Sequence, residues 1–361
     1  MTKRRVVTLI SAGFVLALLL SVIFKLYASS PSQSSELVGA ATNGFPVVNN
    51  QESDYYVPDR TAGHVHKPHA VRVLPWKEHP KGSIRMAVNN LGFRDDADTV
   101  VTKPRQTYRI LVTGDSHIDG VVYNAESFAK RLETMMNGAN QKAPFEVLNG
   151  GTGYYGPYHY AGFLQKFLYL KPDLFLVVLY TGNDFLDGVT TAQIRHRIQI
   201  PERPADYYRA LNEAAAESQG AVSQSLNQAY FFKIYPDLES IAVDIAYEQM
   251  FEITRTCASA GIQFIVVTLP TKCDMPTAAN NAAYKNASAK LGLTLGDVEI
   301  NRRMGHKLLT KLRTAGIKTL DPFDEMQQAG AELFWETDYH LNHTGHNLLA
   351  RIVFTYLKAS L

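Results

Sequence analysis

The sequence is poor in cysteine and carries almost no net charge. Two cysteines, Cys257 and Cys273, occur in 361 residues, and 36 basic residues oppose 34 acidic ones, which leaves a net charge of +2. Without a strong positive field we expect no nucleic-acid partner. A strand expected over 262–269 would separate the two cysteines by about 25 Å, whereas a disulfide needs Cα atoms within about 7 Å. We therefore expect them to stay unpaired, unless the loop after Leu269 folds back.

The sequence also lacks internal repeats and recognisable sets of metal ligands. The region 54–105 is the richest in histidine, with His64, His66, His69 and His79. No cysteine accompanies these histidines and they have no helical spacing, in contrast to the ligand sets of zinc sites. We expect them to be surface or turn residues, and we expect no metal and no other cofactor.

One long apolar run is present, and it lies at the start of the chain. Residues 6–24 form a run of about 19 residues, close to the roughly 20 that cross a bilayer as a helix. Three basic residues at 3–5 precede the run and Lys25 follows it, an asymmetry that places the amino end in the cytoplasm. We expect residues 1–28 to be a signal anchor, with the remainder extracytoplasmic and the protein attached to the membrane. Cleavage of this segment stays an alternative.

Two segments of different composition follow. Residues 29–53 are rich in Ser, Asn and Gln without periodicity, which indicates a flexible tether. Residues 54–105 contain short apolar runs separated by Pro, Gly and Asn, for example Ala70–Leu74 and Ile84–Val88. This pattern predicts an extension built of short strands.

From residue 106 to 361 the pattern alternates between strands and helices. The strand candidates are Tyr108–Thr113, Phe145–Leu148, Leu174–Tyr180, Ile262–Leu269 and Ile317–Leu320. The helix candidates are Ser127–Met136, Tyr158–Leu170, Ile245–Ala260, Ala283–Leu291, Arg302–Ala315 and Gly345–Lys358. Such alternation predicts a three-layer α/β domain with a central, mostly parallel sheet. Residues 185–244 are too long for a simple connection, so we expect an insertion that lies over the sheet edge it leaves from.

Four polar blocks carry the candidate chemistry. They are Gly114–His117, Asn149–Gly153, Thr181–Asp184 and Asp338–Asn342. The first three follow predicted strands, and the fourth precedes the last predicted helix. Because the carboxyl ends of parallel strands meet at one sheet edge, the first three blocks converge there, where open α/β folds bind their ligands.

These blocks contain the residue types that serine catalysis needs. Ser116 can be the nucleophile if His340 takes its proton, with Asp338 orienting the imidazole. The oxyanion of a tetrahedral intermediate needs preorganised donors, and we expect these to be the N–H of Ser116, the N–H of Gly151 and the side-chain amide of Asn183. His117 and His343 are weaker candidates for the base, because His117 adjoins the nucleophile in sequence and His343 falls in the first turn of the last helix.

With these four blocks in order, the chain resembles the SGNH (GDSL-like) hydrolases over about residues 106–361. The resemblance implies a flavodoxin-like sheet and a serine hydrolase. It matches Ser116 to the nucleophile, Gly151 and Asn183 to oxyanion donors, and His340 to the base. The segment 89–95 is similar to the lead-in of membrane-anchored members.

The last block departs from the usual spacing of this family, in which Asp stands three residues before His. Here the spacing is Asp338-x-His340. That form resembles the branch of the family that includes polysaccharide O-acetyltransferases. The assignment of Asp338 as the orienting carboxylate is therefore less secure than in the usual spacing, and a transferase function is an alternative.

The expected function is an extracytoplasmic serine esterase acting on an acyl ester, with an acetyl ester on a carbohydrate as the leading substrate class. Tyr154, Tyr155 and Trp335 are candidates for stacking on sugar rings or lining the pocket. Packing against the core is their alternative role. Two other functions stay open, an O-acyltransferase that uses the same serine and a non-catalytic carbohydrate-binding protein. The acyl group, the alcohol and the oligomeric state are not determined by the sequence.

Overall fold

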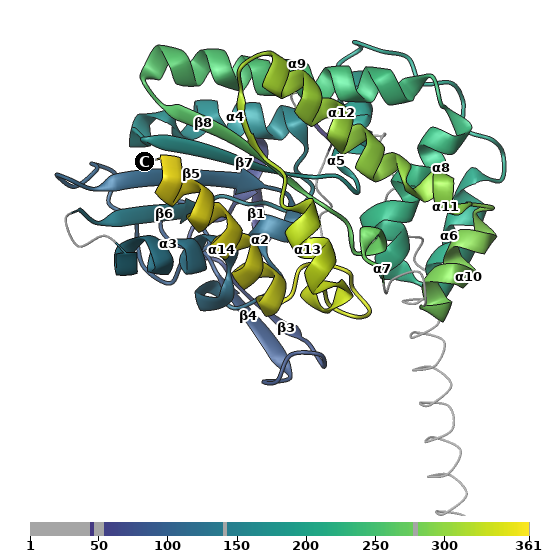
Figure 1. Ribbon diagram of the computed structural model, residues 1–361, viewed down its shortest axis with the longest axis horizontal. Helices are drawn as coiled ribbons and strands as arrows, with labels where there is room; N and C mark the ends of the chain where they lie inside the picture. Colours follow the sequence, from purple (N-terminus) through teal and green to yellow (C-terminus); the bar gives the residue numbers. More distant parts are fainter. Residues whose placement is uncertain (1–43, 47–53, 140–142, 277–280, 361) are drawn as a thin grey trace, which may run out of the picture. The chain divides into compact units, whose positions relative to one another are not determined.

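A five-stranded sheet forms the centre of the protein (Figure 1). The computed structural model describes residues 44–46, 54–139, 143–276 and 281–360. The strands run in the order β6-β5-β7-β8-β9, and all neighbouring pairs are parallel. Their bounds are β5 Tyr108–Gly114, β6 Phe145–Asn149, β7 Leu174–Tyr180, β8 Gln263–Leu269 and β9 Lys318–Leu320. This is the flavodoxin-like order 2-1-3-4-5, so the predicted α/β fold with a parallel sheet is confirmed.

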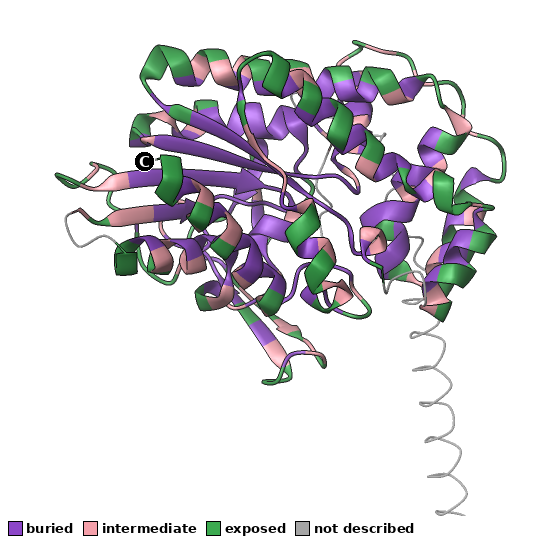
Figure 2. Ribbon diagram, in the orientation of Figure 1, coloured by how far each residue is buried: buried purple, intermediate pink, exposed green. Residues whose placement is uncertain are grey.

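Helices cover both faces of this sheet because side chains of successive strand residues point to opposite faces. In β7, Phe175, Val177 and Leu179 belong to one hydrophobic core. Leu174, Leu176 and Val178 belong to the other core. The first face is covered by α4 Pro157–Phe167, α5 Asp184–Ile194, α9 Leu238–Ala260 and α12 Ile300–Thr314. The second face is covered by α3 Phe128–Ala139, α13 Phe323–Ala329 and α14 His343–Ser360 (Figures 1 and 2).

Additional short helices pack together beside the carboxyl edge of the sheet. They are α6 Tyr207–Glu217, α7 Gln219–Ala221, a π-helical turn Val222–Leu226, α8 Asn227–Ile234, α10 Ala282–Lys290 and α11 Leu295–Val298. Their shared core includes Leu211 and Tyr284, and it also takes in Tyr339 from the loop before α14. The predicted insertion 185–244 includes α5 and the first turns of α9, but both pack in the main helix layer. The added helices between α5 and α9 are therefore a shorter segment than the predicted insertion.

Two hairpins precede the sheet domain. The first pairs β1 Tyr56–Asp59 with β2 Gly63–His66, and the second pairs β3 Val71–Pro75 with β4 Ser83–Ala87. The second hairpin matches the two short strands expected near residues 70–74 and 84–88. Phe45, which falls in the predicted tether, is buried with its ring 4.7 Å from the ring of His159.

Short single turns of 3-10 helix complete the described structure. They span Asn124–Glu126, Leu168–Leu170, Lys272–Asp274 and Ala331–Leu333. Cys257 and Cys273 are both free, as expected. Within the four described ranges no helix combines the length and apolarity needed to cross a membrane. The predicted anchor at 1–28 and all of the tether except 44–46 lie outside those ranges.

Candidate active site

The nucleophile candidate Ser116 lies directly beyond the carboxyl end of β5. It opens the four-residue helix α2, Ser116–Asp119, which Asp115 caps by accepting the His117 N–H at 2.9 Å. Gly114 makes this sharp exit possible, because a Cβ at this position would meet Ile118 Cγ1 at 2.6 Å and the Val178 carbonyl oxygen at 2.9 Å. The strand end and the cap therefore fix the backbone that carries the Ser116 hydroxyl.

A hydrogen-bonded series joins Ser116, His340 and Asp338. The Ser116 Oγ lies 2.8 Å from His340 Nε2, and His340 Nδ1 lies 2.5 Å from Asp338 Oδ1. The same Oδ1 accepts the backbone N–H of His340 at 3.2 Å. The short Asp-x-His spacing reaches this geometry because Tyr339 adopts a left-handed backbone with φ +72, a conformation that is uncommon for a bulky residue.

The charges in this series support each other. Burial disfavours the imidazolium of His340, but the charge and the hydrogen bond of Asp338 outweigh it, so the pKa of His340 is raised. Burial would raise the pKa of Asp338, yet the pair with His340 lowers it. Nearby, burial raises the pKa of the Asp115 carboxyl to about 7. The arrangement thus holds a carboxylate behind an imidazole that is ready to accept a proton.

The three expected oxyanion donors differ in whether they already donate a hydrogen bond within the protein. Within the described residues, neither the Ser116 N–H nor the side-chain nitrogen of Asn183 has a hydrogen-bond partner. The N–H of Gly151 does, because it donates to Asn149 Oδ1 at 3.1 Å. Gly151 also lies against the end of α2, where an added Cβ would be 2.3 Å from the Asp119 nitrogen. Two of the three donors are therefore open for an oxyanion, and the third is held by a neighbouring side chain.

The imidazole of His117 is neutral and connects two other segments through hydrogen bonds. Its Nδ1 accepts the Leu341 N–H at 3.3 Å, so Nε2 carries the proton and donates to Gln224 Oε1 at 3.1 Å. Burial lowers the pKa of His117 well below its usual value. The nucleophile loop, the His340 loop and the π-helical turn meet at this side chain. His343 points elsewhere, with its ring 5.9 Å from that of Trp335.

Two of the three aromatic candidates for substrate contact are wrong. Tyr155 is fully buried and its hydroxyl donates to the His64 carbonyl oxygen at 2.5 Å. Trp335 is also buried, and its Nε1 donates to the Val121 carbonyl at 3.0 Å. Both side chains are occupied by core packing and cannot stack on a ligand. Tyr154 is different, since 55% of it is exposed beyond β6.

The amino-terminal extension supplies buried groups that the sequence did not single out. His64, His66 and His79 are buried, so the expectation of surface histidines is wrong for these three. His66 Nε2 lies 3.2 Å from Asp119 Oδ2, and Arg94 Nη1 donates to Asp119 Oδ1 at 2.8 Å. This pairing lowers the pKa of Asp119 despite its burial. No group of side chains suited to holding a metal occurs in the described part of the chain.

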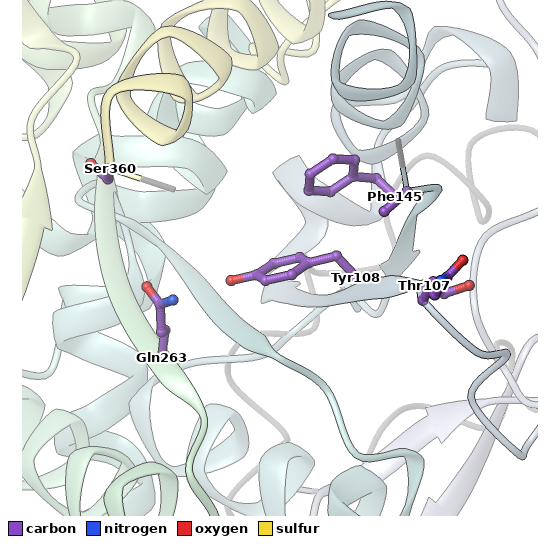
Figure 3. A pocket seen from close by; sticks show the side chains of 7 residues that line it. Thr107, Tyr108, Phe145, Gln263 and Ser360 are labelled. Atoms are coloured by element: carbon purple, nitrogen blue, oxygen red, sulfur yellow. The ribbon is translucent and has the colours of Figure 1, made fainter. Parts of the chain in front are cut away.

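A hollow lies at the other edge of the sheet. It has a volume of about 520 Å³ and is lined by Gln106, Thr107, Tyr108, Ala143, Phe145, Gln263 and Ser360 (Figure 3). These residues lie at the amino ends of β5, β6 and β8 and at the end of α14. The hollow therefore shares no residue with the Ser116 site.

Comparison with known proteins gives similarity in structure only. No family model and no curated protein matches the chain. A GDSL-like lipase from Bacteroides thetaiotaomicron has 9% identity and a TM-score of 0.38, with 73% of this chain and 93% of that chain covered. An acetylxylan esterase from Geobacillus stearothermophilus, solved as a catalytic mutant, has 10% identity and a TM-score of 0.38, with 69% and 93% covered. An esterase from a Pseudoalteromonas species has 11% identity and a TM-score of 0.36, with 70% and 98% covered. The assignment below therefore rests on the geometry of the site.

Proposed function

We propose that the protein is a serine esterase of the SGNH type. The observation that carries this proposal is the Ser116–His340–Asp338 series at the carboxyl edge of the sheet, with distances of 2.8 and 2.5 Å. Ser116 attacks the carbonyl carbon of an ester, and His340 Nε2 takes the hydroxyl proton as the bond forms. Asp338 keeps the imidazole in the required tautomer and stabilises its positive charge.

The oxyanion of the tetrahedral intermediate is bound by the Ser116 N–H and the Asn183 amide. Gly151 joins them if its N–H is shared with or released from Asn149. His340 then returns its proton to the departing alcohol, which leaves the acyl group on Ser116. Water activated by His340 releases the acid. A sugar hydroxyl in place of that water would make the same acyl-enzyme a transferase.

We propose an acylated carbohydrate as substrate and an extracytoplasmic, membrane-anchored location. The exposed ring of Tyr154 follows the strand that ends at the oxyanion block, with its centroid 6.5 Å from that of Tyr56. Tyr56 in turn donates to Asp119 at 3.1 Å, so Tyr154 is connected to the far end of α2. The basic and apolar residues 3–24 support the anchor. Protease added outside intact cells, with any outer barrier opened, should digest the carboxyl-terminal domain, whereas a protected domain would contradict this location.

A covalent probe and a kinetic assay test the reaction itself. A fluorophosphonate should label the purified full chain at Ser116, and a simple acetyl ester should be hydrolysed. Ser116→Ala should abolish labelling and reduce turnover by more than about 10³-fold, while Ser259→Ala, an exposed serine on α9, should match the wild type. Turnover near wild type in Ser116→Ala would remove this serine from the reaction. Acetyl transfer to an added oligosaccharide, in place of acetate release, would favour the transferase.

A further inference from the structure

Two charged side chains from distant parts of the chain hold the loop that carries Asp338. The first is Glu78, in the turn between β3 and β4. Its Oε2 accepts the Glu336 N–H at 2.5 Å and its Oε1 accepts the Thr337 N–H at 3.1 Å. The Thr337 hydroxyl donates to the same carboxylate. Glu78 thus takes up the backbone donors of the two residues directly before Asp338.

The second is Lys272, the first residue of the 3-10 turn that follows β8. This lysine is only 2% exposed, and its Nζ donates to the carbonyl oxygens of Trp335 at 3.1 Å and of Glu336 at 2.8 Å. It also donates to the Glu336 carboxylate at 3.1 Å and lies 4.2 Å from the ring centroid of Tyr339. A buried ammonium group is costly unless it is paired and hydrogen-bonded, and this loop supplies those partners.

These contacts replace the hydrogen bonds that regular secondary structure would provide. Residues 336 and 337 belong to no helix or strand and both are exposed, so no regular backbone hydrogen bonds of a helix or a sheet hold them in place. The carboxylate binds N–H groups and the ammonium binds carbonyls of one short segment, and charge-assisted bonds of this kind are stronger than neutral ones. On the third side, Gly220 of α7 packs so closely that a Cβ would be 2.2 Å from the Thr337 carbonyl oxygen.

We propose that Glu78 and Lys272 are positioning residues that hold Asp338 against His340, an inference that rests on the proposed serine-esterase function. The Asp-x-His spacing needs this support because it depends on the left-handed backbone of Tyr339, whose cost the surrounding contacts must offset. Neither Glu78 nor Lys272 touches Ser116 or the imidazole of His340. They act through the loop alone.

The test replaces Glu78 without changing its size. Glu78→Gln keeps one acceptor oxygen but presents an amide nitrogen to a backbone N–H, so one of the two hydrogen bonds to backbone N–H groups is lost. Glu325→Gln, the same change at an exposed residue of α13, is the matched control. Lys272→Met is a second variant that removes the ammonium group while keeping an unbranched side chain. If this buried variant does not fold, Glu78→Gln alone decides the outcome.

Two readouts separate positioning from general stability. In kinetics on an acetyl ester, Glu78→Gln should lower kcat by about 10- to 100-fold, as expected for a misplaced catalytic group, with KM nearly unchanged. In an imidazole NMR titration of the full chain, the pKa of His340 should fall toward its ordinary value of about 6.5, because Asp338 is less well placed. Asp115, Asp119 and the His117 ring also act on His340, and neither variant touches them.

The proposal is overturned if Glu78→Gln matches Glu325→Gln in both readouts. It is also overturned if kcat falls only with the fraction of folded protein while the pKa of His340 stays at its wild-type value. An inactive wild type would refute the proposed esterase instead. The titration does not depend on turnover and would still decide whether Glu78 positions Asp338.

Discussion

Replacing Asp338 by asparagine separates the two contributions that this carboxylate makes to His340. A single oxygen, Oδ1, accepts both the imidazole Nδ1 proton and the backbone N–H of His340. The carbonyl oxygen of an asparagine can occupy that place and keep both hydrogen bonds. The amide nitrogen of the asparagine then takes the position of Oδ2, which has no hydrogen-bond partner among the described residues. The Asp338 side chain is 29% exposed. The tautomer is therefore retained, and the negative charge is lost.

The size of the effect follows from that lost charge. A carboxylate and an imidazolium with charge centres about 4 Å apart attract each other by about 4 kcal/mol at an effective dielectric constant of about 20. This interaction stabilises the imidazolium that forms in the transition state. At 1.36 kcal/mol for each factor of ten, its loss lowers kcat by roughly 10³-fold. His340→Ala removes the base itself and should lower kcat by about 10⁶-fold, near the effect of removing the nucleophile.

The assay is the pH dependence of kcat/KM for a small acetyl ester. Activity needs neutral His340, so the acidic limb reports its pKa, which Asp338 raises in the wild type. In Asp338→Asn this limb should move to lower pH while kcat at the plateau falls. A defect as large as that of His340→Ala would mean that the asparagine has reversed the tautomer. An unchanged limb and unchanged kcat would show that Asp338 does not serve His340.

Four further substitutions test other parts of the site. Asn183→Ala should lower kcat by about 10²- to 10³-fold with little change in KM if its amide is an oxyanion donor, measured by steady-state kinetics. Gly151→Ala should lower the thermal unfolding midpoint, because the new Cβ would lie 2.3 Å from the Asp119 nitrogen. Tyr154→Ala should raise KM for an acetylated oligosaccharide but not for a small acetyl ester. Tyr155→Phe should instead reduce the unfolding free energy by about 1 kcal/mol, the usual contribution of one hydrogen bond, without changing KM.

The sheet could be predicted because its signal is local. The central strand β7 is buried on both faces, so its sequence is an uninterrupted apolar run, Leu174–Tyr180, and the structure gives it the same bounds. The carboxyl-terminal helix likewise has an apolar stripe in its sequence, and Leu349, Val353 and Leu357 on that stripe are buried. The polar blocks at the strand ends follow directly from these boundaries.

The aromatic residues near the site could not be assigned in this way. Tyr154 and Tyr155 are neighbours with the same chemistry, yet one is exposed and the other has no exposed surface. The difference comes from the backbone, since Tyr154 has φ +65 and so turns its ring away from the core. It also comes from His64 of the first hairpin, whose carbonyl oxygen accepts the Tyr155 hydroxyl proton from 91 positions earlier in the chain. The sequence pattern of residues 154–160 alone does not predict that contact.

A long separation in sequence also explains why the support of the loop that carries Asp338 could not be predicted. Glu78 and the amide groups it binds are more than 250 positions apart, with sequence separations of 258 and 259. A glutamate in a turn has no local feature that distinguishes it from a solvated surface residue. Its role appears only when the hairpin lies against the loop before α14. The unusual Asp-x-His spacing therefore depends on segments outside the motif. The left-handed backbone of Tyr339 shortens the loop, and the residues that hold this loop can come from any part of the chain that packs against it.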